Sequence, residues 1–410
     1  MLKLSRLAVP ATLLLCNSAW AQSSVTLYGL IDAGITYLSD AQIRKSPSGQ
    51  LTGSHQIAFT DGTTRGLGGS RWGLKGSEDL GGGLSAIFTM ENGFYINNGA
   101  LGQGGAMFGR QVYVGLASPR GSITVGRQYD TEADFVSPYT AFMFAGLTGA
   151  LPGDIDGDAH SRRLNNSIKF KSASYKGLQA GGMYSLGGQS GDFTRSQVWA
   201  LGASYSLDAF SVGVGYYNAR NPNLSAFGNS PISGGPTVNN LGSIGTSTSP
   251  ESYPIYAGYA SAHSFEIYAA GASYVFGPAT AAVLVSHAAF ENLGDLNSGP
   301  NPLQYSGNAI FNSGELTLMY KFTPVLFTGV AYTYTRNGGA DGRGGANYQQ
   351  GLLGVQYLLS KRTELYASAV YQVASGTDSL GQPAVANIEL LTASSNNRQL
   401  AVRAGIVHRF

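Results

Sequence analysis

The sequence has little charge, almost no cysteine and no long apolar run. Only 12% of its 410 residues are charged, about half of the ~25% that is usual for a soluble domain. Its single cysteine, Cys16, lies near the N-terminus, so the rest of the chain can form neither a disulfide nor a thiolate metal site. Beyond that region no run approaches the ~18 consecutive apolar residues of a transmembrane helix. These absences argue against a disulfide-stapled secreted domain and against a helical membrane protein.

Residues 1–21 have the pattern of a secretory signal peptide. Two basic residues open the segment, an apolar stretch follows, and small residues precede a cleavage site between Ala21 and Gln22. The apolar stretch is shorter than the ~20 residues of a membrane anchor. We therefore expect a signal peptide over residues 1–21 and a single mature domain, without cysteine, over residues 22–410.

Removal of that segment would take away two of the 25 basic residues and none of the 23 acidic ones, which leaves a net charge of zero. A neutral exported protein lacks the basic surface of a nucleic-acid binder. The sequence contains no nucleophile elbow, no zinc-protease motif and no phosphate-binding loop, and its five histidines are scattered. We therefore expect no enzyme activity, no catalytic, cofactor-binding or metal-binding residues, and no nucleic-acid partner.

What the sequence has in excess is glycine. The 58 glycines are about twice the ~7% of average composition, and they are spread along the chain among Tyr, Val, Phe and Thr. Many runs of roughly ten residues alternate polar and apolar positions. In residues 84–91, for example, Leu84 and Phe88 share one face, whereas Thr89 and Glu91 lie on the other. Such alternation indicates strands with one apolar face.

We count sixteen such runs, joined alternately by short turns and long polar loops. The first two, 25–38 and 70–78, flank a long loop; another long loop covers 220–263; the last run is 399–410. Charged residues in mid-strand, tyrosines near strand ends and an aromatic last residue favour a membrane barrel with a polar interior. The expected fold class is therefore all-β: a transmembrane antiparallel β-barrel of 16 strands with short periplasmic turns and long outer loops.

The connection over residues 131–163 is unusually long for an ordered domain, and long ordered loops are usually functional. We expect this third outer loop to fold into the bore and narrow it. It ends in Arg162 and Arg163, and its acidic residues are Glu132, Asp134, Asp154, Asp156 and Asp158. The last three alternate, which leaves two interpretations open: an acidic cluster at the pore mouth, or a calcium site. Glycine and glutamate do not stand where a calcium-binding EF-hand loop needs them.

Five blocks of the sequence carry a resemblance: SVTLYGLIDAG (24–34), GSRWGLKGSEDLG (69–81), GRQVYVGL (109–116), VGRQYD (125–130) and QLAVRAGIVHRF (399–410). Together they resemble the general diffusion porins of Gram-negative outer membranes, of the β-proteobacterial type. The resemblance implies a homotrimer of sixteen-stranded barrels in outer-membrane lipid and lipopolysaccharide, each barrel with its own pore. It also implies that the last strand, ending in Phe410, is the signal that the barrel-assembly machinery reads.

The expected function is a water-filled channel for passive diffusion of small hydrophilic solutes and ions, with selectivity set by a charged constriction. Two alternatives remain open. A substrate-specific channel would need an aromatic track in the bore, and no such track is evident in the sequence. An exported β-rich adhesin would be soluble after export.

Strand parity and the resemblance nominate charged residues for the constriction. Parity points Arg71, Lys75, Lys169 and Lys171 inward, and Arg163 continues the inward parity of its strand. In the resembling porins, basic residues of the wall face acids on the inserted loop. The candidate basic wall is Arg71, Lys75, Arg110, Arg163 and Lys169, and the candidate acidic side is Glu91, Asp134, Asp154 and Asp156. The alternative is that these are solvated charges without effect on transport. We expect a preference for anions that Arg71→Ala and Arg163→Ala would reduce.

Three further arginines are left outside the constriction. Arg127 belongs to a strand with apolar residues in both parities, and we expect it near a subunit contact. Arg403 and Arg409 have inward parity in the last strand, nearer the periplasmic mouth. For these two the expectation is a solvated charge.

Overall fold

Strands account for most of the chain in the computed structural model, which describes residues 24–160, 162–230 and 233–410. The expected signal peptide and its cleavage site, Ala21 and Gln22, lie outside the described residues. The strands are β1 Ser24–Lys45, β2 Leu51–Asp61, β3 Arg71–Gly81, β4 Leu84–Gly93, β5 Gln111–Ser118, β6 Gly121–Tyr129, β7 Arg163–Ser172, β8 Leu178–Ser185, β9 Val198–Leu207, β10 Phe210–Arg220, β11 Ser264–Phe276, β12 Ala279–Leu293, β13 Gly307–Lys321, β14 Leu326–Asn337, β15 Gly345–Leu358, β16 Thr363–Thr377 and β17 Arg398–Arg409.

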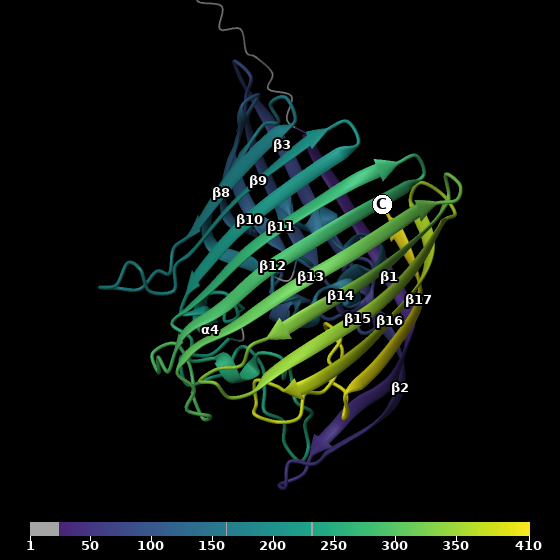
Figure 1. Ribbon diagram of the computed structural model, residues 1–410. Helices are drawn as coiled ribbons and strands as arrows, with labels where there is room; N and C mark the ends of the chain where they lie inside the picture. The colour runs from purple at the N-terminus through teal and green to yellow at the C-terminus, as the bar shows by residue number, and fades with distance from the viewer. Residues whose placement is uncertain (1–23, 161, 231–232) are drawn as a thin grey trace, which may run out of the picture.

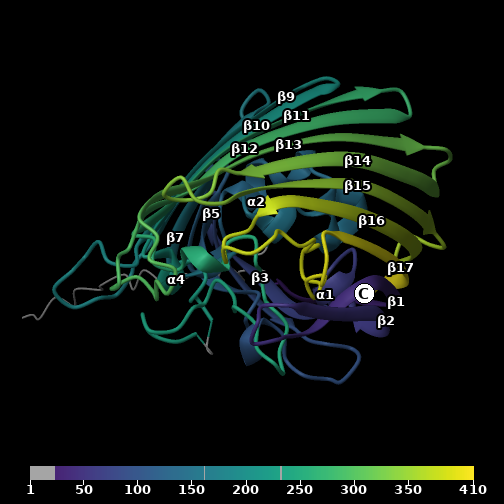
Figure 2. The same cartoon turned by 60° about the horizontal axis from the view of Figure 1, so that its bottom comes forward.

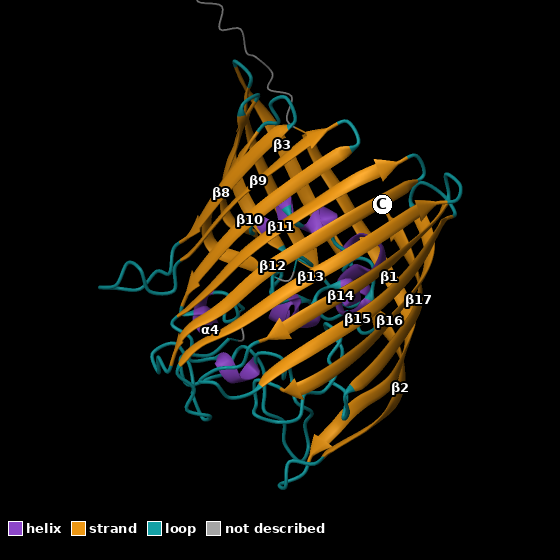
Figure 3. Cartoon of the chain, in the orientation of Figure 1, coloured by secondary structure: helices purple, strands orange, loops and turns teal. Residues whose placement is uncertain are grey.

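Sixteen of these strands, β1 and β3 to β17, close into one antiparallel barrel. Each pairs with its neighbour in the sequence, and the ring closes where β1 pairs with β17 on one edge and with β3 on the other. Short turns join the strands at one end, and the long loops gather at the other (Figures 1 and 3). The predicted sixteen-stranded barrel is thus confirmed.

The remaining strand, β2, lies where the sequence analysis expected a loop, and that expectation was wrong. The strand β1 continues to Lys45, and β2 pairs with its outer part, from Ala33 opposite Asp61 to Lys45 opposite Leu51. The short helix α1 (Gly62–Arg65) and the residues up to Ser70 follow, and β3 then resumes pairing on the same edge of β1. The exposed positions of β2 include Thr52, Ser54 and His55 beside Ile57 and Phe59, so its apolar pattern is broken.

The lipid-facing surface follows the period of two. In β14, Val330 and Tyr332 are exposed on the outside, whereas Thr333 and Thr335 are buried on the inside. Since neighbouring strands repeat this alternation, the barrel wall is apolar outside and mostly polar inside. No helix among the described residues has the length and hydropathy of a membrane span.

The last residue takes part in closing the barrel. The backbone N–H of Phe410 donates to Gly29 O, and Gly29 N–H donates to Phe410 O, both at 3.1 Å. A Cβ on Gly29 would lie 2.5 Å from the Phe410 ring. The ring therefore lies directly over a glycine of the first strand, a known way in which an aromatic residue protects a glycine at a strand edge.

The third outer loop lies inside the barrel, as predicted. It contains α2 (Glu132–Phe135), α3 (Phe142–Ala145) and the 3₁₀ turns η2 (Ser137–Tyr139), η3 (Gly146–Gly149) and η4 (Pro152–Asp154). Figure 2 looks towards the long-loop end and shows these blue segments within the ring of strands. A Cβ on Gly213 of β10 would come within 1.8 Å of the Phe135 carbonyl oxygen. Glycines of the inner wall thus let the loop backbone approach the sheet closely, which accounts for part of the glycine excess.

Two further loops fill the outer half of the interior, the fifth over β10 to β13 and the eighth over β16, β17 and β1. The fifth loop contains α4 (Pro222–Ser225) and η5 (Ala257–Tyr259) and follows β10, and the eighth loop joins β16 to β17. Another 3₁₀ turn, η1 (Gln103–Gly105), lies in the second loop. Tyr259 of the fifth loop packs against Phe290 of β12 and Phe311 of β13 in a buried aromatic core. The cavities that remain lie largely towards β1 and β3 to β6.

Candidate functional site: a charged constriction

Two cavities meet inside the barrel. The outer one, here called the vestibule, has a volume of about 550 Å³ and is lined by the first, second, third, fifth and eighth outer loops. The inner cavity has a volume of about 410 Å³ and reaches Tyr28, Glu91 and Arg409 on the short-turn side. Both cavities are lined by Arg71, Arg110 and His160. These three side chains therefore mark the constriction between them.

Three guanidinium groups, the arginine cluster Arg71, Arg110 and Arg163, surround this point. Arg110 Nε lies 2.7 Å from Glu91 Oε1, and Arg110 Nη2 donates to Tyr129 OH at 2.8 Å. Arg163 Nη2 donates to the same hydroxyl at 3.1 Å, and its guanidinium lies 4.8 Å from the Tyr129 ring centre. Tyr129, which ends β6, therefore holds two like charges side by side.

One carboxylate faces the arginine cluster. Glu91, on β4, pairs with Arg110, accepts a hydrogen bond from Tyr28 OH at 3.0 Å and lies 3.9 Å from Arg71 Nε. Lys75 lies beyond it towards the short turns, 5.3 Å from the centre of the Tyr28 ring, and is exposed. Among the residues that the structure describes, the constriction thus carries three arginines and one glutamate, which is an excess of positive charge.

Lys169 and Asp134, two other nominated residues, anchor the start of the third loop to the wall. Lys169 Nζ donates to the carbonyl oxygens of Tyr129 at 2.8 Å and Asp130 at 3.1 Å. Asp134 pairs with Lys169 and, at 3.1 Å, with Lys171. Neither Lys169 nor Asp134 lines the vestibule or the inner cavity. The structure therefore groups Arg71, Arg110, Arg163 and Glu91 and leaves this ion pair outside the group.

The other acids of the third loop are buried in an acidic cluster of Asp130, Glu132, Asp154, Asp156 and Asp158. Of these, Asp154 alone lines the vestibule, and its side chain is nearly inaccessible. Arg162 lies beside the cluster and donates to the carbonyl oxygens of Asp154 at 3.1 Å and Ile155 at 2.9 Å. In the part of the chain that the structure describes, no three His, Cys, Asp or Glu side chains converge as a metal site.

Burial changes the charge that the acidic cluster carries. Burial raises the pKa of Asp130 to about 6 and, with the charge of Asp154, that of Asp156 to about 6. The pKa values of Glu132 and Asp158 are raised further, by burial and then by neighbouring carboxylates. Since a raised carboxyl pKa favours the protonated form, the loop holds less negative charge near neutral pH than its composition indicates.

His160 was not singled out by the sequence analysis, yet it lines both cavities. Its ring lies 5.4 Å from that of Tyr129 and 4.9 Å from that of Phe142. Burial, and then the charge of Arg163, lower its pKa to about 4, so the imidazole is neutral at neutral pH. A single histidine in a long loop carries no pattern from which its position between the two cavities could be predicted.

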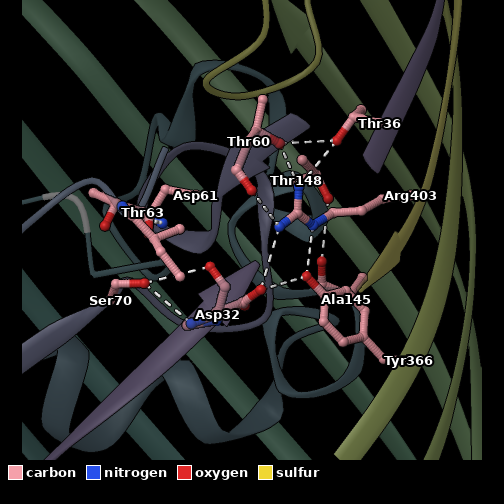
Figure 4. A network of polar contacts seen from close by, with 12 residues as sticks. Asp32, Thr36, Thr60, Asp61, Thr63, Ser70, Ala145, Thr148, Tyr366 and Arg403 are labelled. Carbon is pink, nitrogen blue, oxygen red and sulfur yellow. Dashed lines mark hydrogen bonds and ion pairs between the residues drawn. The ribbon is translucent and has the colours of Figure 1, made fainter. Parts of the chain in front are cut away.

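The first outer loop also reaches the interior, and Arg403 holds it there (Figure 4). Arg403 Nη2 lies 3.2 Å from Asp32 Oδ1, and Tyr366 OH donates to the same oxygen at 2.6 Å. Asp32 Oδ2 accepts from Gly68 N–H at 3.1 Å, and Arg403 also donates to Thr60 O at 3.1 Å. Arg403 is buried in this network, so the expectation of a solvated charge was wrong.

The first loop in turn touches the third. Leu147 N–H donates to Gly66 O at 3.2 Å, and a Cβ on Gly146 would lie 2.1 Å from that oxygen. The network around Asp32 therefore positions a short segment, residues 62–70, that supports the third loop. The sequence gives no local sign of this contact, because its partners are about 80 residues apart.

Two other arginines have separate places. Arg409 lines the inner cavity and pairs with Glu364 at 2.9 Å. Arg127 donates to the carbonyl oxygens of Gly109 at 2.9 Å and Asn229 at 3.0 Å. Arg127 thus ties β6 to neighbouring loops.

Comparisons with known proteins agree with this architecture. The chain is 32% identical over 216 residues to an outer membrane porin protein of Bordetella pertussis, covering 49% of this chain and 53% of that protein. It is 31% identical over 182 residues to outer membrane porin protein 32 of Delftia acidovorans, covering 43% and 48%. The chain thus spans about half the length of the curated relatives it matches.

Solved structures share the fold over nearly the whole chain. The anion-selective porin from Comamonas acidovorans superposes with a TM-score of 0.65 at 20% identity, covering 95% of this chain and 100% of that one. The trimer form of OmpT from Vibrio cholerae gives 0.62 at 14% identity, covering 95% and 99%. The family described as Gram-negative porin matches residues 7–377. With most of its length matched, the chain belongs to the Gram-negative porin family and is an outer-membrane β-barrel.

Proposed function

We propose that this barrel is a water-filled channel through which small hydrophilic solutes and ions diffuse passively, and that the constriction favours anions. The observation that carries the proposal is the meeting of two cavities at Arg71, Arg110 and His160. A passage that narrows between charged side chains fixes the size of a solute and sets the field it meets.

The balance of charge supports the preference for anions. Among the described residues, three arginines surround one glutamate, Glu91, and Glu91 is already engaged by Arg110 and Tyr28. The acids of the third loop are buried, and most have raised pKa values, so they contribute little opposing field. The Comamonas porin that shares this fold is named as anion-selective. Each of these three observations supports a preference for anions over cations.

We infer that the working unit is a homotrimer. One structural neighbour is named as a trimer form, and the outer face of β4 to β6 carries an apolar hollow of about 330 Å³. An apolar concavity on the barrel wall suits contact with a second protomer as well as with lipid. Electrophoresis of the unheated protein in SDS tests this, because a monomer band without heating would contradict the trimer.

The experiment for the channel is planar-bilayer recording from the purified, refolded protein. We expect stepwise currents in KCl that rise linearly with voltage, and a reversal potential in a KCl gradient with the sign of chloride permeation. A potential of the opposite sign would contradict the anion preference while leaving the channel intact. Absence of current from correctly folded protein would contradict the channel itself.

A further inference from the structure

The two sides of the vestibule differ in chemistry. The arginine cluster stands at its floor, whereas much of the remaining wall is apolar. That apolar wall is built from three loops that are distant in the sequence: Phe142 and Leu147 of the third loop, Phe227, Leu241, Tyr253 and Tyr256 of the fifth, and Leu390 of the eighth. A passage for small inorganic ions alone has no use for such a surface, because ions gain nothing from contact with apolar side chains. Apolar walls with a few placed polar groups are typical of binding sites for organic molecules.

The aromatic members of the wall are packed together. The rings of Phe227 and Tyr256 lie 5.5 Å apart, and Tyr256 stacks 5.5 Å from Tyr253. Phe142 lies 4.9 Å from His160 at the constriction. The aromatic wall therefore reaches the floor where the arginines stand, and one small molecule can touch both.

Arg71 offers hydrogen-bond donors there. Its one ion-pair partner among the described residues, Glu91, is 3.9 Å away, beyond hydrogen-bond distance, and the Arg71 side chain is 27% exposed. Arg110, by contrast, is engaged by Glu91 and Tyr129. Since a guanidinium matches a carboxylate with two parallel hydrogen bonds, Arg71 can bind a carboxylate without giving up a protein contact.

The negative groups of the vestibule oppose an anion only weakly. Glu389 is buried, and burial, followed by the charge of Asp154, raises its pKa well above the ordinary value. Asp154 has Arg162 beside it and accepts from Ala159 N–H at 3.0 Å. Arg162 itself lies 5.8 Å from the Phe227 ring centre and adds positive charge behind the aromatic wall.

We propose that the vestibule is a binding site for small carboxylates that carry an aromatic ring, with the carboxylate on Arg71 and the ring against Phe142 and Phe227. The proposal rests on the channel function above and names the class of solute that the channel retains on its way. A volume of about 550 Å³ holds one such ring and leaves room for water. Such a molecule would slow the passage of other ions while it is bound.

The test is block of the KCl current by benzoate in bilayers that contain the wild-type protein. Two control compounds separate the contribution of the carboxylate from that of the ring. Acetate has the negative charge without the ring, and benzylamine has the ring with a positive charge. We expect benzoate to reduce the current saturably, at about tenfold lower concentration than acetate, the factor expected for burying an aromatic ring. Benzylamine should block less than benzoate, because its ammonium group is repelled by the arginine cluster. Equal block by benzoate and acetate would overturn the proposal. A KCl current that persists in that case leaves the channel function standing, whereas absence of any KCl current contradicts both.

Variants locate the site. Phe227→Ala should weaken the benzoate block about tenfold and leave the block by acetate unchanged, and Phe142→Ala gives an independent reading should the first variant not fold. The matched control is Phe322→Ala, because Phe322 is 60% exposed in the short turn between β13 and β14. Benzoate block that is insensitive to both vestibule variants, or equally sensitive to Phe322→Ala, would refute the assignment.

Discussion

Replacing Arg71 by glutamine should reduce the preference for anions by a factor that the geometry allows us to estimate. Arg71 borders both cavities and is the member of the arginine cluster without a close hydrogen bond to the described residues. The constriction carries three arginines and one glutamate, so the substitution lowers its net charge from plus two to plus one. Glutamine keeps much of the side-chain volume, and the change is therefore mainly one of charge.

The size of the effect follows from Coulomb's law. An anion that passes about 4 Å from the guanidinium gains roughly 1 kcal/mol in bulk water and roughly 4 kcal/mol at an effective dielectric constant of ~20. A wet passage lies nearer the lower value, and about 1 kcal/mol corresponds to roughly a fivefold change in rate. We therefore expect the chloride permeability to fall about fivefold. The chloride-to-potassium permeability ratio should fall by at least that factor, because the substitution also removes the repulsion of potassium.

The assay is the reversal potential of single proteins in a KCl gradient, at low and at high salt. Because the Debye length shortens from ~10 Å at 0.1 M to ~3 Å at 1 M, the difference between wild type and Arg71→Gln should shrink as salt rises. Lys361→Gln is the matched control, since Lys361 is exposed in the short turn between β15 and β16. An unchanged ratio in Arg71→Gln, or an equal shift in Lys361→Gln, would refute the reasoning.

Three other predictions concern stability and the third loop. Arg403→Met leaves the buried Asp32 carboxylate without its guanidinium, and should lower the free energy of unfolding in urea by about 3–5 kcal/mol; a loss below about 1 kcal/mol would contradict the network. Gly213→Val should push the third loop off the wall, because a Cβ there meets the Phe135 carbonyl oxygen at 1.8 Å, and so change the single-channel conductance. Gly351→Val, with open space around it, is the control, and equal conductance in both variants would count against the close packing. Burial raises the pKa of Asp130 and Asp156 from 3.8 to about 6, so the folded protein holds protons that the unfolded chain has lost, and stability should fall as pH rises from about 4 through 6. The lowered pKa of His160 acts in the opposite direction within this window, but it is one group against several carboxyls; an unfolding midpoint that is no lower at pH 7 than at pH 4.5 would disprove the account.

The barrel itself was predictable because the sequence pattern that specifies it involves only residues close together in the chain. A strand with lipid on one side and a polar interior on the other repeats every two residues, and turns and loops of unequal length mark its two ends. The inward parity of Arg71 in β3 and the terminal aromatic residue could be read in this way. The strand β2 was not predicted because its exposed positions mix the polar Thr52, Ser54 and His55 with Ile57 and Phe59, and because it pairs with β1 alone among the described strands.

The constriction was predictable only in part. That Arg71, Arg110, Arg163 and Glu91 would lie together was suggested by parity and by the resemblance, and their roles in transport remain predictions. The bridging by Tyr129, the place of His160 and the aromatic wall had no signal in the sequence. The wall in particular brings together Phe142, Phe227 and Leu390 from three separate loops.

The physical reason for this division is the range of the interactions. The alternation of polar and apolar residues and the lengths of the loops are properties of residues close together in the sequence. The sequence by itself therefore determined a sixteen-stranded membrane barrel and the long third loop. How that loop packs against the inner wall, which of its acids are buried and which surfaces face Arg71 depend on contacts between residues far apart in the sequence, such as Gln356 Nε2 donating to Phe144 O at 3.1 Å. Those contacts exist only after the barrel has closed, and the tertiary structure alone decided them.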